Sequence, residues 1–156
     1  MRKINVLAKV NVVSIQLVKE KSLTYGYKQI NSPMDAASIA GDFLAGADRE
    51  HFVVICLDTK NNVNALNTVS VGTLNSSLVH PREVFKAAIL ANSNAIILIH
   101  NHPSGDPTPS REDLEITKRL VEAGNILGIE VMDHVVIGDN GKYVSLKERG
   151  DIQHTD

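Results

Sequence analysis

The sequence predicts an α/β fold in which a mixed β-sheet is flanked by helices. Residues 95–99 (AIILI) form a continuous apolar run, which is typical of a central strand buried on both faces. Helix-start signals lie on either side of this run, and strand-like and helix-like segments alternate through the middle of the chain. With 156 residues, 43% of them hydrophobic, the chain is long enough for one domain with its own core.

The first 31 residues are predicted to form β segments that pack on this domain. Residues 10–18 partly alternate apolar and polar side chains, as a half-buried strand does, and residues 25–30 are a candidate for a second strand. The domain itself is expected to span residues 32–147. Residues 148–156 are polar, and we expect them to form a tail that frays.

Three helices are expected in the domain. Ser32 is a capping residue, Pro33 occupies the first helical position, and Asp35 lies in the first turn. Pro81 opens the second helix and Ser110 begins the third. The side chains expected to face inward are Ala36, Ala37, Ile39, Ala40, Phe43 and Leu44 in the first helix, Val84, Phe85, Ala88 and Ile89 in the second, and Leu114, Thr117, Leu120 and Val121 in the third.

Five strands are expected to form the sheet of the domain. Residues 52–57 are a buried strand, and residues 63–71 return as its antiparallel partner after a polar turn. Residues 95–99 provide the central strand. Residues 129–137 and 143–146 complete the sheet on either side of a turn rich in glycine and asparagine.

Charge, cysteine content and hydropathy exclude several classes of protein. A net charge of −2 gives no support for general affinity to nucleic acid or anionic membranes. The one cysteine, Cys56, rules out an internal disulfide framework and a cysteine-rich zinc site. No segment approaches the ~20 apolar residues of a membrane span, and the N-terminus lacks a signal-peptide pattern. We therefore expect a cytoplasmic protein that does not associate with membranes.

Two histidines follow the predicted central strand at positions 100 and 102. In extended backbone, residues i and i+2 point to the same side, so the imidazoles of His100 and His102 can converge on one ion. Asp113 is a natural third ligand, because the proline- and glycine-rich segment before it can turn the chain back stiffly. A catalytic zinc site has three protein ligands and an open position for water. The sequence therefore predicts a zinc site made by these three residues.

The same residues also fit a purely structural interpretation. Ser110 and Asp113 have the spacing of a capping box, in which the acid is favoured by the helix dipole. A pair of histidines at a strand end is also more often part of the surface than a metal site. The two interpretations are compatible, because a capped first turn would fix the direction of Asp113. The presence of both histidines with both helix residues beside a buried strand favours the metal site.

His100-x-His102, followed after seven residues by Ser110-x-x-Asp113, resembles the JAMM motif of the JAB/MPN metallopeptidase-like domains. The resemblance extends over roughly residues 30–147 and is to the RadC-like branch. It implies a three-layer architecture of the cytidine-deaminase-like type. The segments that carry it are residues 72–75 (GTLN), 80–86 (HPREVFK), 100–105 (HNHPSG) and 133–134 (DH).

Chromosomal members of that branch carry a helix-hairpin-helix DNA-binding region ahead of the domain. This chain has no room for such a region, so we interpret it as a short form, similar to versions found on mobile elements. The departure weakens any DNA role inferred from the "DNA repair" label attached to the family.

The resemblance also implies one zinc ion per chain and a glutamate, upstream of the histidines, that acts as general base. Glu50, just before the strand at residues 52–57, lies where the family places this acid and is the preferred candidate. Glu83, in the first turn of the second helix, is the alternative. Ser110 is implied to stabilise the oxyanion of the reaction. His134 is a candidate for orienting a ligand, although a structural role is favoured.

The leading hypothesis is a zinc-dependent hydrolase that cleaves a peptide or isopeptide bond in a protein or peptide substrate. A DNA-processing protein is one alternative, which the charge does not support, and a non-catalytic module stabilised by metal is another. Zinc deaminase chemistry is excluded, because that site needs paired cysteines. The sequence does not define an oligomeric state, and a homo-oligomer is compatible with it.

Overall fold

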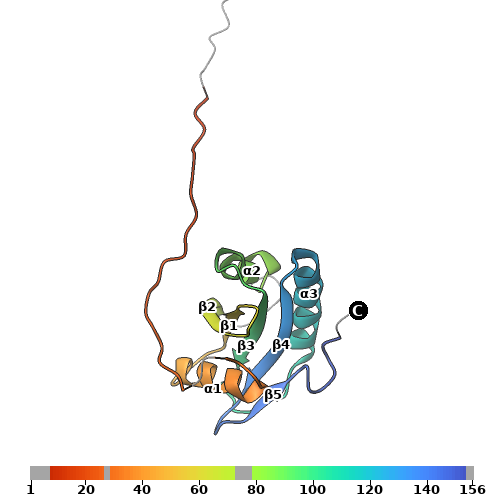
Figure 1. The fold of residues 1–156 in the computed structure, drawn as a ribbon. Coiled ribbons are helices and arrows are strands. Elements are labelled where there is room, and N and C mark those ends of the chain that lie inside the picture. Colours follow the sequence, from red (N-terminus) through yellow and green to blue (C-terminus); the bar gives the residue numbers. More distant parts are fainter. Residues whose placement is uncertain (1–7, 27–28, 73–78, 154–156) are drawn as a thin grey trace, which may run out of the picture.

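The computed structural model describes residues 8–26, 29–72 and 79–153, and within them the chain forms three helices and a five-stranded sheet (Figure 1). The predicted α/β class is confirmed. Most of the GTLN segment lies outside the described residues. The elements in chain order are α1 (Pro33–Phe43), β1 (His51–Leu57), β2 (Val63–Val71), α2 (Pro81–Leu90), β3 (Ala95–Asn101), α3 (Arg111–Leu127), β4 (Glu130–Ile137) and β5 (Tyr143–Ser145).

The sheet is mixed, as predicted, with the strand order β2-β1-β3-β4-β5. β3 and β4 are parallel, and the other neighbouring pairs are antiparallel. A parallel pair needs a crossover connection, which α3 provides between β3 and β4. All seven residues of β3 are buried, so the central strand ends in the interior of the protein.

Alternation along the two central strands divides the core into two layers. Phe52, Val54 and Leu98 point to the face covered by α2 and α3, where they pack with buried residues of both helices. Val53 and Ile99 point to the opposite face, which α1 covers. The three-layer arrangement expected from the resemblance is therefore present (Figure 1).

The predicted helix starts are confirmed by their capping contacts. The Ser32 side chain accepts a hydrogen bond from the backbone N–H of Asp35, whose carboxylate in turn accepts from the Ser32 N–H. His80 caps α2 through Nδ1, which accepts from the backbone N–H of Arg82 at 3.2 Å. The inward direction predicted for Ile89 is wrong, because this side chain is 52% exposed near the end of α2.

The N-terminal segment corrects one prediction. Residues 8–26 form no helix or strand, so the strand expected at residues 10–18 is absent, and Val12 is 99% exposed. Figure 1 shows the first part of this segment extending away from the domain, whereas Lys21, nearer its end, lies over the ring of Phe43 in α1. The second expected strand, at residues 25–30, is represented by a single antiparallel bridge between Gln29 and Asn62. Residues 27–28 lie outside the described residues.

The C-terminal segment also differs from its prediction as a fraying polar tail. Ile152 is buried and packs with Val136 and Leu146, and the Asp151 N–H donates to the Leu146 carbonyl at 2.9 Å. The described part of the predicted tail, residues 148–153, is therefore attached to the domain through one apolar anchor. Among the described residues, no helix is long and apolar enough to cross a bilayer.

Candidate metal centre

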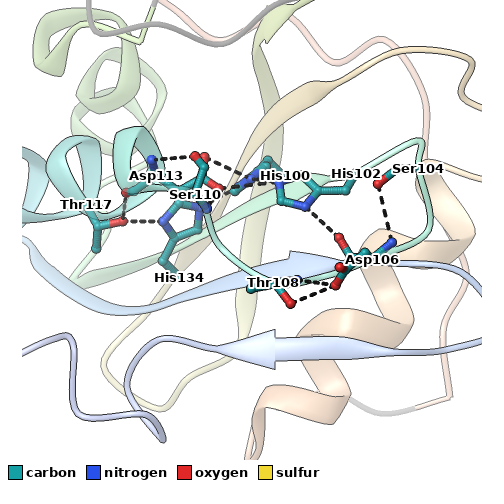
Figure 2. Close-up of polar contacts among 9 residues, drawn as sticks. All are labelled: His100, His102, Ser104, Asp106, Thr108, Ser110, Asp113, Thr117 and His134. Carbon is teal, nitrogen blue, oxygen red and sulfur yellow. Dashed lines mark hydrogen bonds and ion pairs between the residues drawn. The ribbon is translucent and has the colours of Figure 1, made fainter.

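The residues predicted to bind metal meet where β3 ends and α3 begins (Figure 2). His100 is the sixth residue of β3, has no exposed surface, and points to the α2/α3 side of the sheet, where its ring stacks on Phe52 with centroids 6.2 Å apart. His102 follows the last residue of the strand, and its backbone N–H donates to the Ile137 carbonyl, which extends the pairing with β4. Asp113 lies in the first turn of α3 and is buried.

Four side-chain atoms of three residues converge at this point. His100 Nε2 lies 2.9 Å from His102 Nε2 and 3.2 Å from Asp113 Oδ1, and His102 Nε2 lies 3.4 Å from Asp113 Oδ2. A tetrahedral ion bound at ~2.0–2.1 Å separates such ligand atoms by roughly 3.3 Å. These donor atoms therefore have about the spacing of ligands around one metal ion, so the three residues could hold such an ion.

The chemistry of the donors also fits a cation. His102 Nδ1 is 2.7 Å from the backbone carbonyl oxygen of Asp106, and because a carbonyl only accepts, the proton of a neutral His102 ring must lie on Nδ1. His102 Nε2 then presents a lone pair to the same point as the carboxylate of Asp113. Such a convergence of acceptors is unfavourable unless a metal ion or a proton lies between them.

Asp113 combines the two functions that the sequence left open. Its Oδ2 accepts from the backbone N–H of Ser110 at 2.7 Å, and the Ser110 Oγ accepts from the Asp113 N–H at 3.1 Å, so the capping box is complete. Burial alone would raise the pKa of the Asp113 carboxyl, but its interaction with the His100 ring and the hydrogen bond from the Ser110 N–H outweigh burial and hold the pKa well below its usual value. The capping box thus holds the ionised carboxylate of Asp113 in a position that faces the two histidines.

Ser110 is exposed at the start of α3, beside the converging ligands (Figure 2). Because its Oγ accepts a hydrogen bond from Asp113, the hydroxyl proton is available to a second partner. The structure thus places Ser110 next to the site, while its predicted role in stabilising an oxyanion stays a prediction.

Glu50 lies at the same edge of the sheet as the histidines. β1 pairs with β3 so that Phe52 is opposite His100, and continuing this antiparallel register by two residues places Glu50 across from His102. Asn101 fixes the backbone on both sides of Glu50: its Oδ1 accepts from the His51 N–H at 2.7 Å, and its Nδ2 donates to the Arg49 carbonyl at 3.0 Å. The sequence did not reveal this clamp.

Glu83 has a different environment. Both of its carboxylate oxygens accept from the Nζ of Lys86, at 3.0 and 2.9 Å, within the first turns of α2. This ion pair is largely exposed and lowers the pKa of Glu83 through the Lys86 hydrogen bond. The surroundings of Glu83 are those of a helix-surface acid, and the choice of Glu50 over Glu83 as the base stays a prediction.

His134 contacts the site directly, although the sequence favoured a purely structural role for this residue. Its Nε2 lies 2.8 Å from His100 Nδ1, and its Nδ1 lies 2.5 Å from the hydroxyl of Thr117 in α3. Complete burial holds the pKa of His134 well below its usual value, which favours a neutral ring. Thr117 was predicted only to point inward, and its spacing of four residues from Asp113 is the signal that could have connected it to the site.

A groove with a volume of about 680 Å³ runs between α1 and the β4–β5 hairpin and reaches His102. Its size lies within the range of small-molecule and peptide sites. Small residues predominate along it, which leaves room for a chain that approaches the backbone closely. The lining includes Ala37, Gly41, Asn101, His102, Ile137 and Tyr143.

The fold and the site together define an α/β domain of the JAB type with a histidine–aspartate group able to bind metal. The chain belongs to the family described as the RadC-like JAB domain, which matches residues 30–151. The family resemblance is therefore confirmed. The match also includes residues 148–151, which were predicted to belong to the polar tail.

Similar proteins are known from several bacteria. A UPF0758 protein of Desulfitobacterium hafniense is 64% identical over 121 residues, which cover 78% of this chain and 53% of that protein. A UPF0758 protein of Caldanaerobacter subterraneus is 60% identical over 121 residues (78% and 52%), and one of Bacillus cereus is 57% identical over 123 residues (79% and 54%). The chain spans about half the length of the curated relatives it matches.

Proposed function

We propose that this domain is a zinc-dependent hydrolase of the JAMM type that cleaves an amide bond in a peptide or isopeptide substrate. The observation that carries the proposal is the convergence of three residues: His100 Nε2 lies 2.9 Å from His102 Nε2, and each of these nitrogens lies 3.2–3.4 Å from one oxygen of the Asp113 carboxylate. Two imidazoles and one carboxylate are a ligand set of catalytic zinc sites, which keep a further position open.

The chemistry divides between the metal and the side chains of this chain. When bound, the metal supplies Lewis acidity, which polarises a carbonyl group and makes water more acidic. Glu50, held by the Asn101 clamp across from His102, accepts a proton from water and returns it to the leaving amine. The Ser110 hydroxyl, whose oxygen is oriented by the Asp113 N–H, donates to the developing oxyanion.

The groove supports an extended substrate. It begins at His102 and continues between α1 and the β4–β5 hairpin, so a chain lying in it would bring one side of the scissile bond to the metal. Its small side chains suit a segment of small residues. The substrate class that we propose is a protein or peptide with such a segment. We propose the cytoplasm as the place of hydrolysis.

The first test is the metal content of the purified protein, measured by elemental analysis beside the double variant His100→Ala/His102→Ala. We expect about one zinc ion per chain in the wild type and none in the variant, because the variant keeps only one of the three ligands. Negligible metal in both, even with zinc supplied during purification, would remove the basis of the proposal.

The second test is hydrolysis of a panel of peptides and isopeptides by the zinc-loaded protein. Glu50→Gln should lose turnover while keeping its zinc, and Glu83→Gln, a matched loss of a carboxylate, should keep turnover. The reverse result would identify Glu83 as the base. A wild type that binds zinc and gains thermal stability but cleaves no substrate would instead be a metal-stabilised interaction module.

A further inference from the structure

A row of three buried side chains, His100, His134 and Thr117, begins on the side of the His100 ring away from the proposed metal (Figure 2). His100 Nδ1 is 2.8 Å from His134 Nε2, and His134 Nδ1 is 2.5 Å from the Thr117 hydroxyl oxygen. That oxygen is 2.6 Å from the backbone carbonyl oxygen of Asp113. The row therefore starts at one ligand residue and ends at another.

The Asp113 carbonyl determines the direction of the first hydrogen bond. A carbonyl oxygen has no proton, so a contact of 2.6 Å with the Thr117 oxygen is attractive only if the hydroxyl donates to it. A hydroxyl has one proton, and this contact uses it. The Thr117 oxygen can then only accept from His134.

The same counting continues through the two rings. Because Thr117 can only accept, His134 must carry its proton on Nδ1. His134 is completely buried against the rings of Phe52 and His100, an environment that favours an uncharged ring with one proton. Its Nε2 is then a lone pair, and the 2.8 Å contact with His100 requires a proton on His100 Nδ1. This leaves the lone pair of His100 Nε2 directed at the metal position.

We propose that Thr117 and His134 are positioning residues that hold His100 in the Nδ1–H tautomer and so make its Nε2 a metal ligand. The inference rests on the metal site proposed above, and it adds that helix α3 controls the proton on a histidine of strand β3. His102 reaches the same tautomer independently, through the 2.7 Å contact of its Nδ1 with the Asp106 carbonyl. The two ligands thus have separate means of orientation.

The β4 backbone brings His134 into this position. The pairing of β3 with β4 shifts by one residue after Ile96, because Met132 is an extra residue in β4. The shift places His134 opposite Leu98, so that its ring lies on the α2/α3 side of the sheet with His100. Regular pairing continued from Val131 would have turned the side chain of residue 134 to the α1 face.

The tautomer can be measured directly in the zinc-free wild type. Two-bond ¹H–¹⁵N correlation spectra distinguish protonated from unprotonated ring nitrogens, and we expect His134 to be protonated on Nδ1 and unprotonated on Nε2. A His134 ring protonated on Nε2 would overturn the proposal. This measurement needs neither zinc nor a substrate, and it needs no variant that could fail to fold.

Two variants then test the consequence for metal binding. Thr117→Val has nearly the same shape but no hydroxyl, so His134 should move its proton to Nε2, His100 should move its own from Nδ1 to Nε2, and zinc affinity should fall about 10–100-fold. Thr117→Ser keeps the hydroxyl and should keep both the wild-type tautomer and the affinity. Zinc affinity is measured by competition with a chromophoric chelator, after melting curves of the zinc-free proteins show that each variant is folded.

The outcomes separate this inference from the proposed hydrolase function. Wild-type zinc affinity in Thr117→Val, or equal losses in Thr117→Val and Thr117→Ser, would overturn the role of the hydroxyl. A full set of expected tautomers and affinities without hydrolysis of any substrate would contradict the proposed enzyme and support the positioning role of Thr117 and His134.

Discussion

Gly138, in the turn between β4 and β5, leaves no space for a side chain against the loop that connects β3 to α3. A Cβ atom at this position would lie 2.3 Å from the Gly105 carbonyl oxygen and 2.8 Å from Cδ of Pro107. Ordinary contacts begin near 3.4 Å, so Gly138→Ala must separate the turn from the loop by about 1.1 Å (3.4 − 2.3). Overpacking of this kind costs about 1–3 kcal/mol of folding free energy.

The displacement reaches the metal centre through one hydrogen bond. Asp106 lies between Gly105 and Pro107, and its carbonyl accepts from His102 Nδ1 at 2.7 Å. A shift of about 1 Å breaks this bond, because contacts near 3.7 Å are no longer hydrogen bonds. Loss of such an orienting partner lowers metal affinity about 10–100-fold, which corresponds to about 1.4–2.8 kcal/mol.

The assay compares Gly138→Ala with Gly41→Ala, which lies in α1 on the other side of the groove and has no atom within 4 Å of an added Cβ. Zinc affinity comes from chelator competition, and stability from urea unfolding in the presence of EDTA. Gly41→Ala should bind zinc normally and gain up to about 1 kcal/mol from helix propensity. If Gly138→Ala is destabilised but binds zinc as tightly as the wild type, the coupling between the turn and His102 is refuted.

Three further predictions concern stability. Free zinc at about 100 times its dissociation constant should add about 2.7 kcal/mol to the wild type in thermal unfolding and nothing to His100→Ala/His102→Ala. Phe52→Ala should cost about 3–5 kcal/mol in urea unfolding, because the ring is 1% exposed and stacks on His100, and Phe52→Leu should cost less. Burial raises the pKa of the Asp133 carboxyl above its ordinary value of 3.8, so its stabilising effect is complete below 3.8 and is lost as the pH rises through the folded value. In urea unfolding across this range, Asp133→Asn should therefore lack that part of the pH dependence, and an unchanged profile would contradict the assignment.

Most of the fold could be predicted because local signals and tertiary packing agree. The apolar run of β3 is buried throughout, and the caps at Ser32 and Ser110 begin helices as expected. The failure at residues 10–18 has a physical reason. Alternation of apolar and polar residues shows that a segment is able to form a strand, but a strand needs a neighbour to receive its hydrogen bonds, and the sequence does not identify one.

The grouping of the three candidate metal ligands could also be predicted, because their positions follow from two regular elements. A strand places His100 and His102 on one side, and a capped first turn directs Asp113. The sequence could name His134 only as a candidate for orienting a ligand, because the position of its ring depends on the extra residue in β4. A one-residue change of register moves a side chain from one face of a sheet to the other, and no pattern in the sequence marks where the bulge occurs.

Asp113 connects these features, because three of its groups have separate partners. Its N–H is fixed by the Ser110 cap, its carboxylate faces both histidines, and its carbonyl accepts from Thr117. A change in the first turn of α3 would therefore alter the third ligand and, through Thr117 and His134, the tautomer of the first. It follows that hydrogen bonds couple Asp113 to His100 in addition to the proposed metal ion between them, so substitutions at Ser110 and Thr117 should not be additive in their effect on zinc affinity.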